Sequence, residues 1–136
     1  MTAPGPPATL DTNIAVYALM EDRRTEIAVE VLRRCSFMSV QVLNEYANVM
    51  IRKHRKTWTE VANDIADLRE TVPAILPVET SANADALRIA ERYRLGFYDS
   101  LMLAVALNGG AHTIYSEDMR HDLMIDGTLR IVDPFR

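Results

Sequence analysis

The sequence has little cysteine and no long apolar run. Its single cysteine, Cys35, cannot form an internal disulfide or a cysteine-based metal cluster, and we expect it to be a small buried residue. No apolar stretch approaches the roughly 18 residues that a membrane-spanning helix requires. Residues 1–7 lack the basic start and the apolar segment of a secretory signal. We therefore expect a cytoplasmic protein with no membrane partner.

Positive charge is also scarce. The 15 lysines and arginines are outnumbered by 19 acidic residues, which gives a net charge of -4 at pH 7. Any binding to nucleic acid must therefore use a local basic patch or bound cations. The sequence also lacks a glycine-rich phosphate loop and a Gly-x-Ser-x-Gly motif, which argues against a P-loop or an α/β-hydrolase enzyme.

The sequence does contain short apolar runs that alternate with longer segments of helical period. This alternation predicts an α/β fold in which helices cover a parallel sheet. The prolines within residues 4–7 disfavour regular structure, so we expect a disordered leader over 1–7 and a single domain over 8–136. Strands are predicted at residues 8–10, 36–40, 74–78, 112–115 and 129–132. Helices are predicted at residues 14–19, 26–34, 41–55, 82–94 and 97–107, with another that opens at Thr57 and is closed by Pro73.

Four acidic residues stand where the predicted elements meet. Asp11 ends the first strand, Asp118 follows the fourth, and Asp99 begins an apolar helix. Glu45 lies in the second turn of the helix after the second strand. Because ligands bind outside the carboxyl ends of parallel strands, we expect these four carboxylates at one pole of the sheet. Such a group repels itself unless cations neutralise it, and carboxylate oxygens favour Mg²⁺ or Mn²⁺.

Each of these acids also has a purely structural interpretation. Asp11 and Asp99 could each cap the helix that follows. Glu45 could be a solvated helix residue, and Asp118 could belong to a turn. Only the joint placement of the four acids, which depends on the inferred topology, favours a metal site.

A basic run covers residues 52–56 at the end of a predicted helix. Arg52, Lys53 and Arg55 could contact the phosphates of an RNA backbone. The run could equally be a solvated helix end that interacts favourably with the helix dipole. The sequence leaves both interpretations open.

Three blocks of the sequence, in this order and spacing, resemble the PIN-domain nucleases, and among them the VapC-like toxins of bacterial toxin–antitoxin pairs. The likeness spans roughly residues 8–135. The blocks are Leu10-Asp11-Thr12-Asn13-Ile14, the segment Ser39 to Val49, and Phe97-Tyr98-Asp99-Ser100-Leu101 with Ser116-Glu117-Asp118-Met119.

The resemblance implies a three-layer domain in which helices flank a central parallel sheet of about five strands. It also implies an endoribonuclease that depends on Mg²⁺ or Mn²⁺ and attacks the phosphodiester with metal-activated water. In the cell such a toxin is neutralised by a cognate antitoxin protein. The resemblance further suggests a homodimer.

The site residues follow from the resemblance position by position. Asp11 and Asp99 match the family's main metal-binding acids, and Glu45 matches its middle acid. Asp118 matches the final acid, although Glu117 competes for this place. The neighbouring polar positions, which in the family hold water or substrate, are matched by Thr12, Asn13 and Ser116.

Three other functions are compatible with the sequence. A PIN nuclease could act in RNA processing without an antitoxin. A receiver module also clusters acids beside its first strand, but it needs a lysine at a later strand end, whereas Lys53 and Lys56 both fall on a predicted helix. A PIN fold without activity could serve as an interaction protein.

Overall fold

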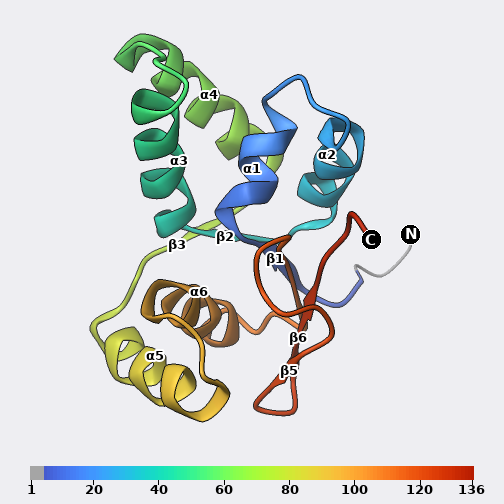
Figure 1. Cartoon of the computed structure of the whole chain (residues 1–136), viewed down its shortest axis with the longest axis vertical. Helices are drawn as coiled ribbons and strands as arrows, with labels where there is room; N and C mark the ends of the chain where they lie inside the picture. Colours follow the sequence, from blue (N-terminus) through green and yellow to red (C-terminus); the bar gives the residue numbers. More distant parts are fainter. Residues whose placement is uncertain (1–4) are drawn as a thin grey trace.

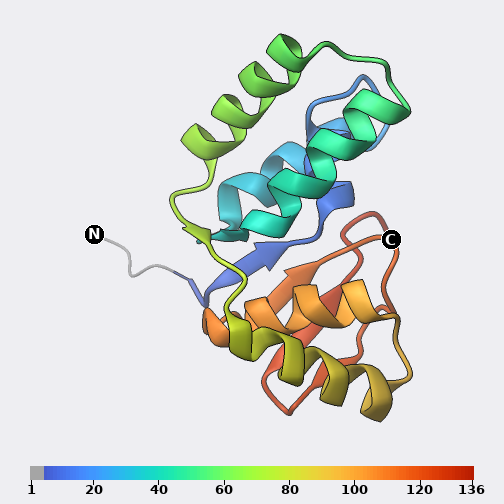
Figure 2. The same cartoon turned by 90° about the vertical axis from the view of Figure 1, so that its left-hand side faces the viewer.

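The computed structural model describes residues 5–136 and has the predicted α/β fold, with helices on both sides of a sheet. Helices α1 to α4 lie on one side of strand β1, and α5 and α6 lie on the other (Figures 1 and 2). The helices are α1 (Thr12–Ala18), α2 (Thr25–Arg34), α3 (Val40–Arg52), α4 (Trp58–Thr71), α5 (Thr80–Tyr93) and α6 (Phe97–Asn108). The strands are β1 (Ala8–Leu10), β2 (Met38–Ser39), β3 (Ile75–Leu76), β4 (Thr113–Tyr115), β5 (Met124–Ile125) and β6 (Leu129–Val132).

The main sheet has four strands in the order β1-β4-β6-β5. Strands β1, β4 and β6 are parallel, and Leu10 is paired with Tyr115 at the carboxyl ends of β1 and β4. Strand β5 runs antiparallel to β6. The parallel register brings the residues that follow β1 and β4 to the same edge of the sheet.

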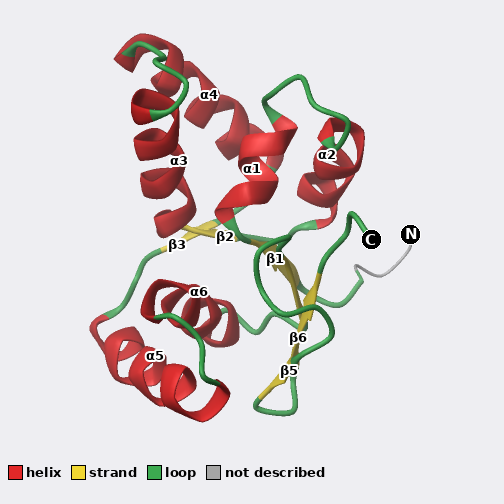
Figure 3. Ribbon diagram, viewed as in Figure 1, coloured by secondary structure: helices red, strands yellow, loops and turns green. Residues whose placement is uncertain are grey.

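The sheet differs in two details from the expected single sheet of about five parallel strands. The first is β5, which forms a hairpin with β6 through Asp126 and Gly127, at φ +50° and +71°. An Asp-Gly pair accommodates these left-handed angles at low cost and is a common hairpin signal. The second is that β2 and β3 form a separate parallel pair of two residues each, and Figure 3 shows how short these strands are beside the helices.

Local chemistry explains why β2 and β3 are so short. Ser39 caps α3 by accepting a hydrogen bond from the backbone N–H of Gln41, so the chain turns helical at Val40. Pro77 follows β3 directly and cannot donate to a ladder. The pair still lies beside β1, because the Thr9 hydroxyl donates to the Phe37 carbonyl at 2.8 Å.

The ends of the helices follow their capping chemistry. The predicted capping box opens α4, since the Thr57 side chain accepts from the Glu60 N–H and the Glu60 side chain accepts from the Thr57 N–H. Helix α3 ends at Arg52, three residues earlier than predicted, and its first residue beyond the end, Lys53, donates its N–H to the Val49 carbonyl. Most of the basic run therefore lies in the connection between α3 and α4.

Helix α6 is the most buried of the helices in residues 5–136. All residues from Ser100 to Ala106 are buried, and the hydroxyl of Ser100 donates to the Gly96 carbonyl at 2.8 Å. A methyl group at Gly109, just after the helix, would lie 2.4 Å from the ring of Phe37, so the helix end approaches the β2 segment too closely for any side chain. Asp99 lies at the opposite end of this buried helix, in its first turn.

Two expectations concern the chain as a whole. No helix within residues 5–136 has both the length and the apolar character that a bilayer crossing requires. The predicted disordered leader falls mainly on residues 1–4, which lie outside the described residues. At its end, the carbonyl of Pro7 accepts a hydrogen bond from the His112 N–H at 2.8 Å, next to the start of β4.

Candidate active site

Asp11 follows β1 directly and caps helix α1. One carboxylate oxygen, Oδ1, accepts from the backbone N–H of Thr12 at 2.8 Å, while Oδ2 accepts from the Ser116 hydroxyl at 2.8 Å. The side chain is only 7% exposed, and this burial is the main reason that its pKa is raised to about 6. The negative charges of Asp99 and Glu45 add to the rise. The capping interpretation of Asp11 is confirmed, but capping uses only one of its two oxygens.

Ser116 connects the two strand ends. It follows β4 and is fully buried, and besides donating to Asp11 its Oγ accepts from the N–H groups of Asp118 and Met119. The Asn13 amide lies 3.3 Å from Oγ of Ser116 and also 3.3 Å from one oxygen each of Asp11 and Asp118. The two polar positions therefore hold acids from opposite ends of the chain together.

Glu45 enters from α3, whose second turn faces α1. Its Oε2 accepts from the Thr12 hydroxyl at 2.5 Å, and its Oε1 accepts from the Gln41 amide at 3.3 Å. The side chain is half-buried rather than fully solvated. The interpretation of Glu45 as a solvated helix residue is therefore wrong, because it is held against the residue that follows Asp11.

Asp99 lies in the first turn of α6 and does not cap that helix. The cap position is Gly96, and within residues 5–136 no hydrogen bond reaches the Asp99 carboxylate. Burial is the main cause of its raised pKa, followed by the charges of Asp118 and Glu45. Asp99 thus faces other acids without a partner of its own.

Asp118 and Glu117 have different surroundings. Glu117 accepts from Nη1 of Arg24 at 2.8 Å and from the hydroxyl of Tyr17 at 3.1 Å. These two donors, from α1 and from the residue before α2, hold its carboxylate in a structural contact. Asp118 is exposed and carries only the 3.3 Å contact with the Asn13 amide. The geometry therefore leaves Asp118, and not Glu117, free to face the other acids.

A pocket of about 370 Å³ collects these side chains, and we call it the acid pocket. Its walls carry carboxylates from four separate segments, and Lys53 is the basic residue that lines it. Within residues 5–136, no three of its acids converge as a closed metal-ligand cluster, because hydroxyl and amide donors hold them against the walls. The residues that line the acid pocket include Asp11, Thr12, Asn13, Glu45, Asp99 and Asp118.

The sequence matches the family model described as "PIN domain" over residues 8–124. This match covers most of the chain. The chain belongs to the PIN domain family. The family match rules out the receiver module, and it agrees with the strand order and with the acids at the carboxyl ends of β1 and β4. Among curated proteins, no sequence matches this PIN domain significantly.

Solved structures of the same fold are similar to this PIN domain. A toxin–antitoxin complex from Klebsiella pneumoniae matches with a TM-score of 0.69 and 20% identity, over 93% of this chain and 97% of the other. VapBC2 from Rickettsia felis, bound to a DNA fragment from its promoter, matches with a TM-score of 0.67 and 19% identity, over 93% and 98%. VapC20 from Mycobacterium tuberculosis, a toxin that cleaves the sarcin–ricin loop, matches with a TM-score of 0.64 and 18% identity, over 82% and 89%.

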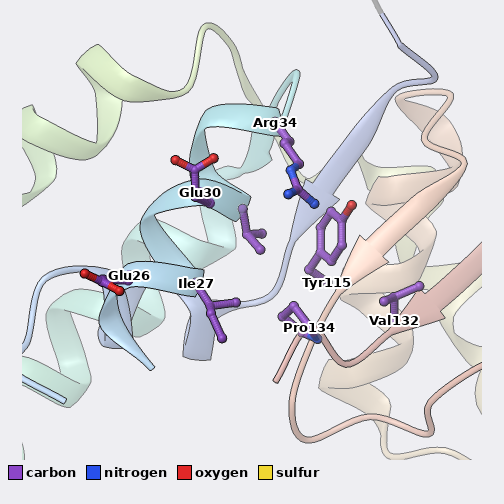
Figure 4. Close-up of a pocket in the computed structure, with 8 residues that line it drawn as sticks. Glu26, Ile27, Glu30, Arg34, Tyr115, Val132 and Pro134 are labelled. Atoms are coloured by element: carbon purple, nitrogen blue, oxygen red, sulfur yellow. The ribbon is translucent and has the colours of Figure 1, made fainter. Parts of the chain in front are cut away.

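A larger hollow of about 550 Å³ lies elsewhere on the PIN domain, between α2 and the ends of β4 and β6. Its walls are mainly apolar and include Ile27 and Val132. Figure 4 shows the carboxylates of Glu26 and Glu30 pointing away from Tyr115 and Val132 rather than into the hollow. Glu26 and Glu30 both lie on α2, so this hollow does not bring together acids from separate segments as the acid pocket does. The acid pocket is therefore the stronger candidate for chemistry.

The structure separates the members of the basic run. Lys53 lines the acid pocket, and together with Arg52 it also lines an adjoining hollow of about 190 Å³. Arg55 is exposed and lies at φ +52°. Lys56 instead pairs with Asp64 at 2.6 Å, so its role is structural.

Sequence reasoning missed two polar residues that line the acid pocket. Asn48 lies three positions after Glu45 on the same helix, and Tyr17 lies four positions after Asn13, so helical spacing could have identified both. The sequence names Lys53 only as a contact of the RNA backbone, because its place in the wall of the acid pocket depends on where α3 ends.

Proposed function

We propose that this PIN domain is a metal-dependent endoribonuclease that acts as the toxin of a toxin–antitoxin pair. The observation that carries the proposal is the acid pocket, where carboxylates from β1, α3, α6 and the segment after β4 line one cavity. Proteins of this family are in general nucleases. Within residues 5–136 none of these four carboxylates forms a salt bridge. Carboxylates without a counter-charge in one cavity are what a nuclease that holds cations needs.

The donor set of the acid pocket fits Mg²⁺ or Mn²⁺. All of the candidate donors are carboxylate, hydroxyl or amide oxygens, and the hard divalent cations prefer such oxygen ligands. Asp11, Glu45, Asp99 and Asp118 would hold the cation. When bound, it supplies a water of lowered pKa and stabilises the negative charge that builds up on the phosphate.

The polar residues of the pocket position the acids. The Ser116 hydroxyl fixes Oδ2 of Asp11, and the Thr12 hydroxyl fixes Oε2 of Glu45. The Asn13 amide sets the place of Asp118 at the rim. Because Asp99 has no hydrogen-bond partner within residues 5–136, its carboxylate can move toward a ligand at little cost. We expect cleavage to give a 5′-phosphate and a 3′-hydroxyl.

RNA is the proposed substrate, and the basic residues beside the pocket support binding of its backbone. Arg52 and Lys53 line the hollow that adjoins the acid pocket, and Arg55 is exposed in the next connection. These basic residues place positive charge beside the pocket in a chain whose net charge is -4. A single strand suits the pocket, because its phosphates can bend into a narrow cavity that a duplex cannot enter.

The proposed partner is a cognate antitoxin protein, and the similar structures support it. Two of them are a toxin–antitoxin complex from Klebsiella pneumoniae and VapBC2 from Rickettsia felis, and a third is FitAcB from Neisseria gonorrhoeae, with a TM-score of 0.63 and 15% identity over 94% of this chain and 98% of the other. We further propose that the toxin acts in the cytoplasm as a homodimer.

An RNA cleavage assay tests the proposed activity. Wild-type protein is incubated with a mixture of RNAs in Mg²⁺ and, separately, in EDTA, and Asp99→Asn is run beside it. We expect cleavage only by wild type in Mg²⁺. Asp85→Asn, a half-buried acid on α5 that does not line the acid pocket, is the control and should keep full activity. Equal cleavage by wild type and Asp99→Asn would refute the proposed site.

A further inference from the structure

The connection between α3 and α4 places an exposed aromatic ring beside the basic run. Trp58, the first residue of α4, is 74% exposed, more than any other large apolar side chain in residues 5–136. It is also the single tryptophan of the chain. Exposing a ring of this size to water is costly, so a ligand that covers it would gain hydrophobic free energy.

Hydrogen bonds to α3 and α4 fix the backbone of this connection. The Lys56 ammonium pairs with Asp64 at 2.6 Å, and Asp64 also accepts from the hydroxyl of the fully buried Tyr46 at 2.7 Å. In addition, the N–H of Lys56 donates to the Met50 carbonyl at 3.1 Å. These contacts fix the connection against α3 and α4, so the backbone just before Trp58 has a defined position.

The other basic residues of the run do not form structural salt bridges as Lys56 does. Within residues 5–136, Arg52, Lys53 and Arg55 have no acidic partner at salt-bridge distance, and all three are exposed. They are therefore available to phosphates. Exposed cations next to an exposed ring are the combination with which proteins bind single-stranded nucleic acid.

The part of this surface that carries Arg52 and Lys53 adjoins the acid pocket. The pocket and the adjoining hollow share Asn48, Val49 and Lys53, so together they follow α3 toward its carboxyl end. Figure 1 shows α3 running from the sheet to the connection with α4. The seven residue steps from Glu45 to Arg52 span about 10 Å of helix, which is within reach of a short strand bound in the pocket.

We propose that Trp58 is a stacking platform for a base of single-stranded RNA, a few nucleotides from the scissile phosphate, while Arg52, Lys53 and Arg55 contact the backbone between them. The proposal rests on the proposed function, because it places this strand in the acid pocket. A single strand is required because a duplex hides the faces of its bases.

The fluorescence of Trp58 provides a direct test, since no other tryptophan contributes. The protein is titrated in EDTA, which prevents cleavage, with an eight-nucleotide oligouridylate and with an abasic oligomer of the same length and charge. Stacking predicts quenching by oligouridylate and not by the abasic oligomer. One stacked base predicts roughly 5- to 150-fold tighter binding of oligouridylate.

Variants separate stacking from charge, with binding measured by the anisotropy of labelled oligomers. Trp58→Ala should remove the preference for oligouridylate over the abasic oligomer, and Trp58→Phe should keep part of it. Lys53→Gln should weaken both oligomers and reduce the salt slope by about 0.7. The controls are Leu87→Ala, an exposed apolar residue on α5, and Arg69→Gln, at the far end of α4, and neither should change the preference.

Several results would overturn the stacking platform. One is equal affinity of wild type for both oligomers, and another is Trp58 fluorescence that oligouridylate leaves unchanged. A blue shift that appears on raising the protein concentration without RNA would mean that a second copy covers the ring. Active cleavage with no effect of Trp58→Ala on binding refutes only the platform, whereas absent cleavage with intact stacking refutes only the nuclease.

Discussion

Asp11 and Asp126 are both aspartates, but their surroundings shift their pKa values in opposite directions. In the corner between α5 and the β5–β6 hairpin, Asp126 accepts from both Nη atoms of Arg88, at 3.1 and 2.8 Å, and from the hydroxyl of Tyr93 at 3.3 Å. The hydrogen bond from Arg88 is the main reason that the pKa of Asp126 is lowered. In the acid pocket, Asp11 has only neutral donors, and its pKa is raised to about 6.

The difference shows which region contains the positive charge that its carboxylate needs. The Arg88–Asp126 corner contains its own counter-charge, so its carboxylate contributes to the stability of the folded chain. The acid pocket carries four carboxylates and one basic residue, Lys53. In Asp11 and Asp99, burial first and the charges of neighbouring acids second raise the pKa and disfavour the charged form. A bound cation would supply in the pocket what Arg88 supplies in the corner.

The largest contrast between the two regions should be in activity. Replacing Asp11 with Asn keeps an oxygen to cap α1 but removes a charge from the pocket, so we expect RNA cleavage in Mg²⁺ to fall by at least about 100-fold. Asp126→Asn should leave the cleavage rate unchanged. Initial rates at matched folded concentration measure both, and a similar loss in the two variants would mean that the pocket has no special role.

The second contrast is in the pH dependence of stability without metal. A raised pKa in the folded state costs nothing below the unfolded value of 3.8 and costs most above pH 6, so stability should decline between these values. The rise from 3.8 to about 6 corresponds to a loss of up to about 3 kcal/mol. Urea unfolding of wild type and Asp11→Asn in EDTA, from pH 4 to pH 8, measures it. A decline of the same size in Asp11→Asn would assign it to other groups.

The third contrast is in the response to Mg²⁺. A cation that binds only the folded state adds about 2.7 kcal/mol at a hundred times its dissociation constant. We expect this gain for wild type and for Asp126→Asn, and little of it for Asp99→Asn. In EDTA at neutral pH, Asp99→Asn should melt above wild type, because the substitution removes repulsion from Asp118 and Glu45. Equal Mg²⁺ responses in thermal melts would exclude Asp99 as a ligand.

The smallest effect belongs to the corner itself. Asp126→Asn should cost at most about 1 kcal/mol at pH 7, because Arg88 is 47% exposed and solvent screens the pair. Asn tolerates the left-handed backbone at this position, so the loss reports the charge. Since the folded pKa is lowered, the loss should shrink as the pH falls below 3.8. Chemical unfolding at pH 7 and pH 3 checks this, and a loss that persists at pH 3 would point to backbone strain instead.

The positions of the candidate acids could be predicted because they follow from topology. Asp11 follows β1 and Asp118 comes soon after β4, and parallel pairing of these strands brings both to one edge. Asp99 could be placed from the apolar character of α6, which forces its first turn toward the core. These inferences need only the direction of each strand and the face of each helix.

The remaining details depend on contacts that a linear pattern does not encode. The choice between Glu117 and Asp118 follows from Arg24, which reaches Glu117 from the start of α2. The place of Lys53 depends on the end of α3, which shifts when a few residues change conformation. The β5 strand is different, because its Asp126-Gly127 turn was present in the sequence as a usable signal.

The hydrogen bond from Ser116 to Asp11 joins residues 105 positions apart, and it has a consequence for synthesis. A ribosome releases the amino-terminal part of a chain first, so Asp11 emerges long before Ser116 and Asp118. A growing chain therefore lacks the acid pocket until nearly all of it has been translated. Pairing over so long a loop is also slow, which delays assembly of the pocket further. The proposed activity therefore cannot arise in a nascent chain before its translation is almost finished.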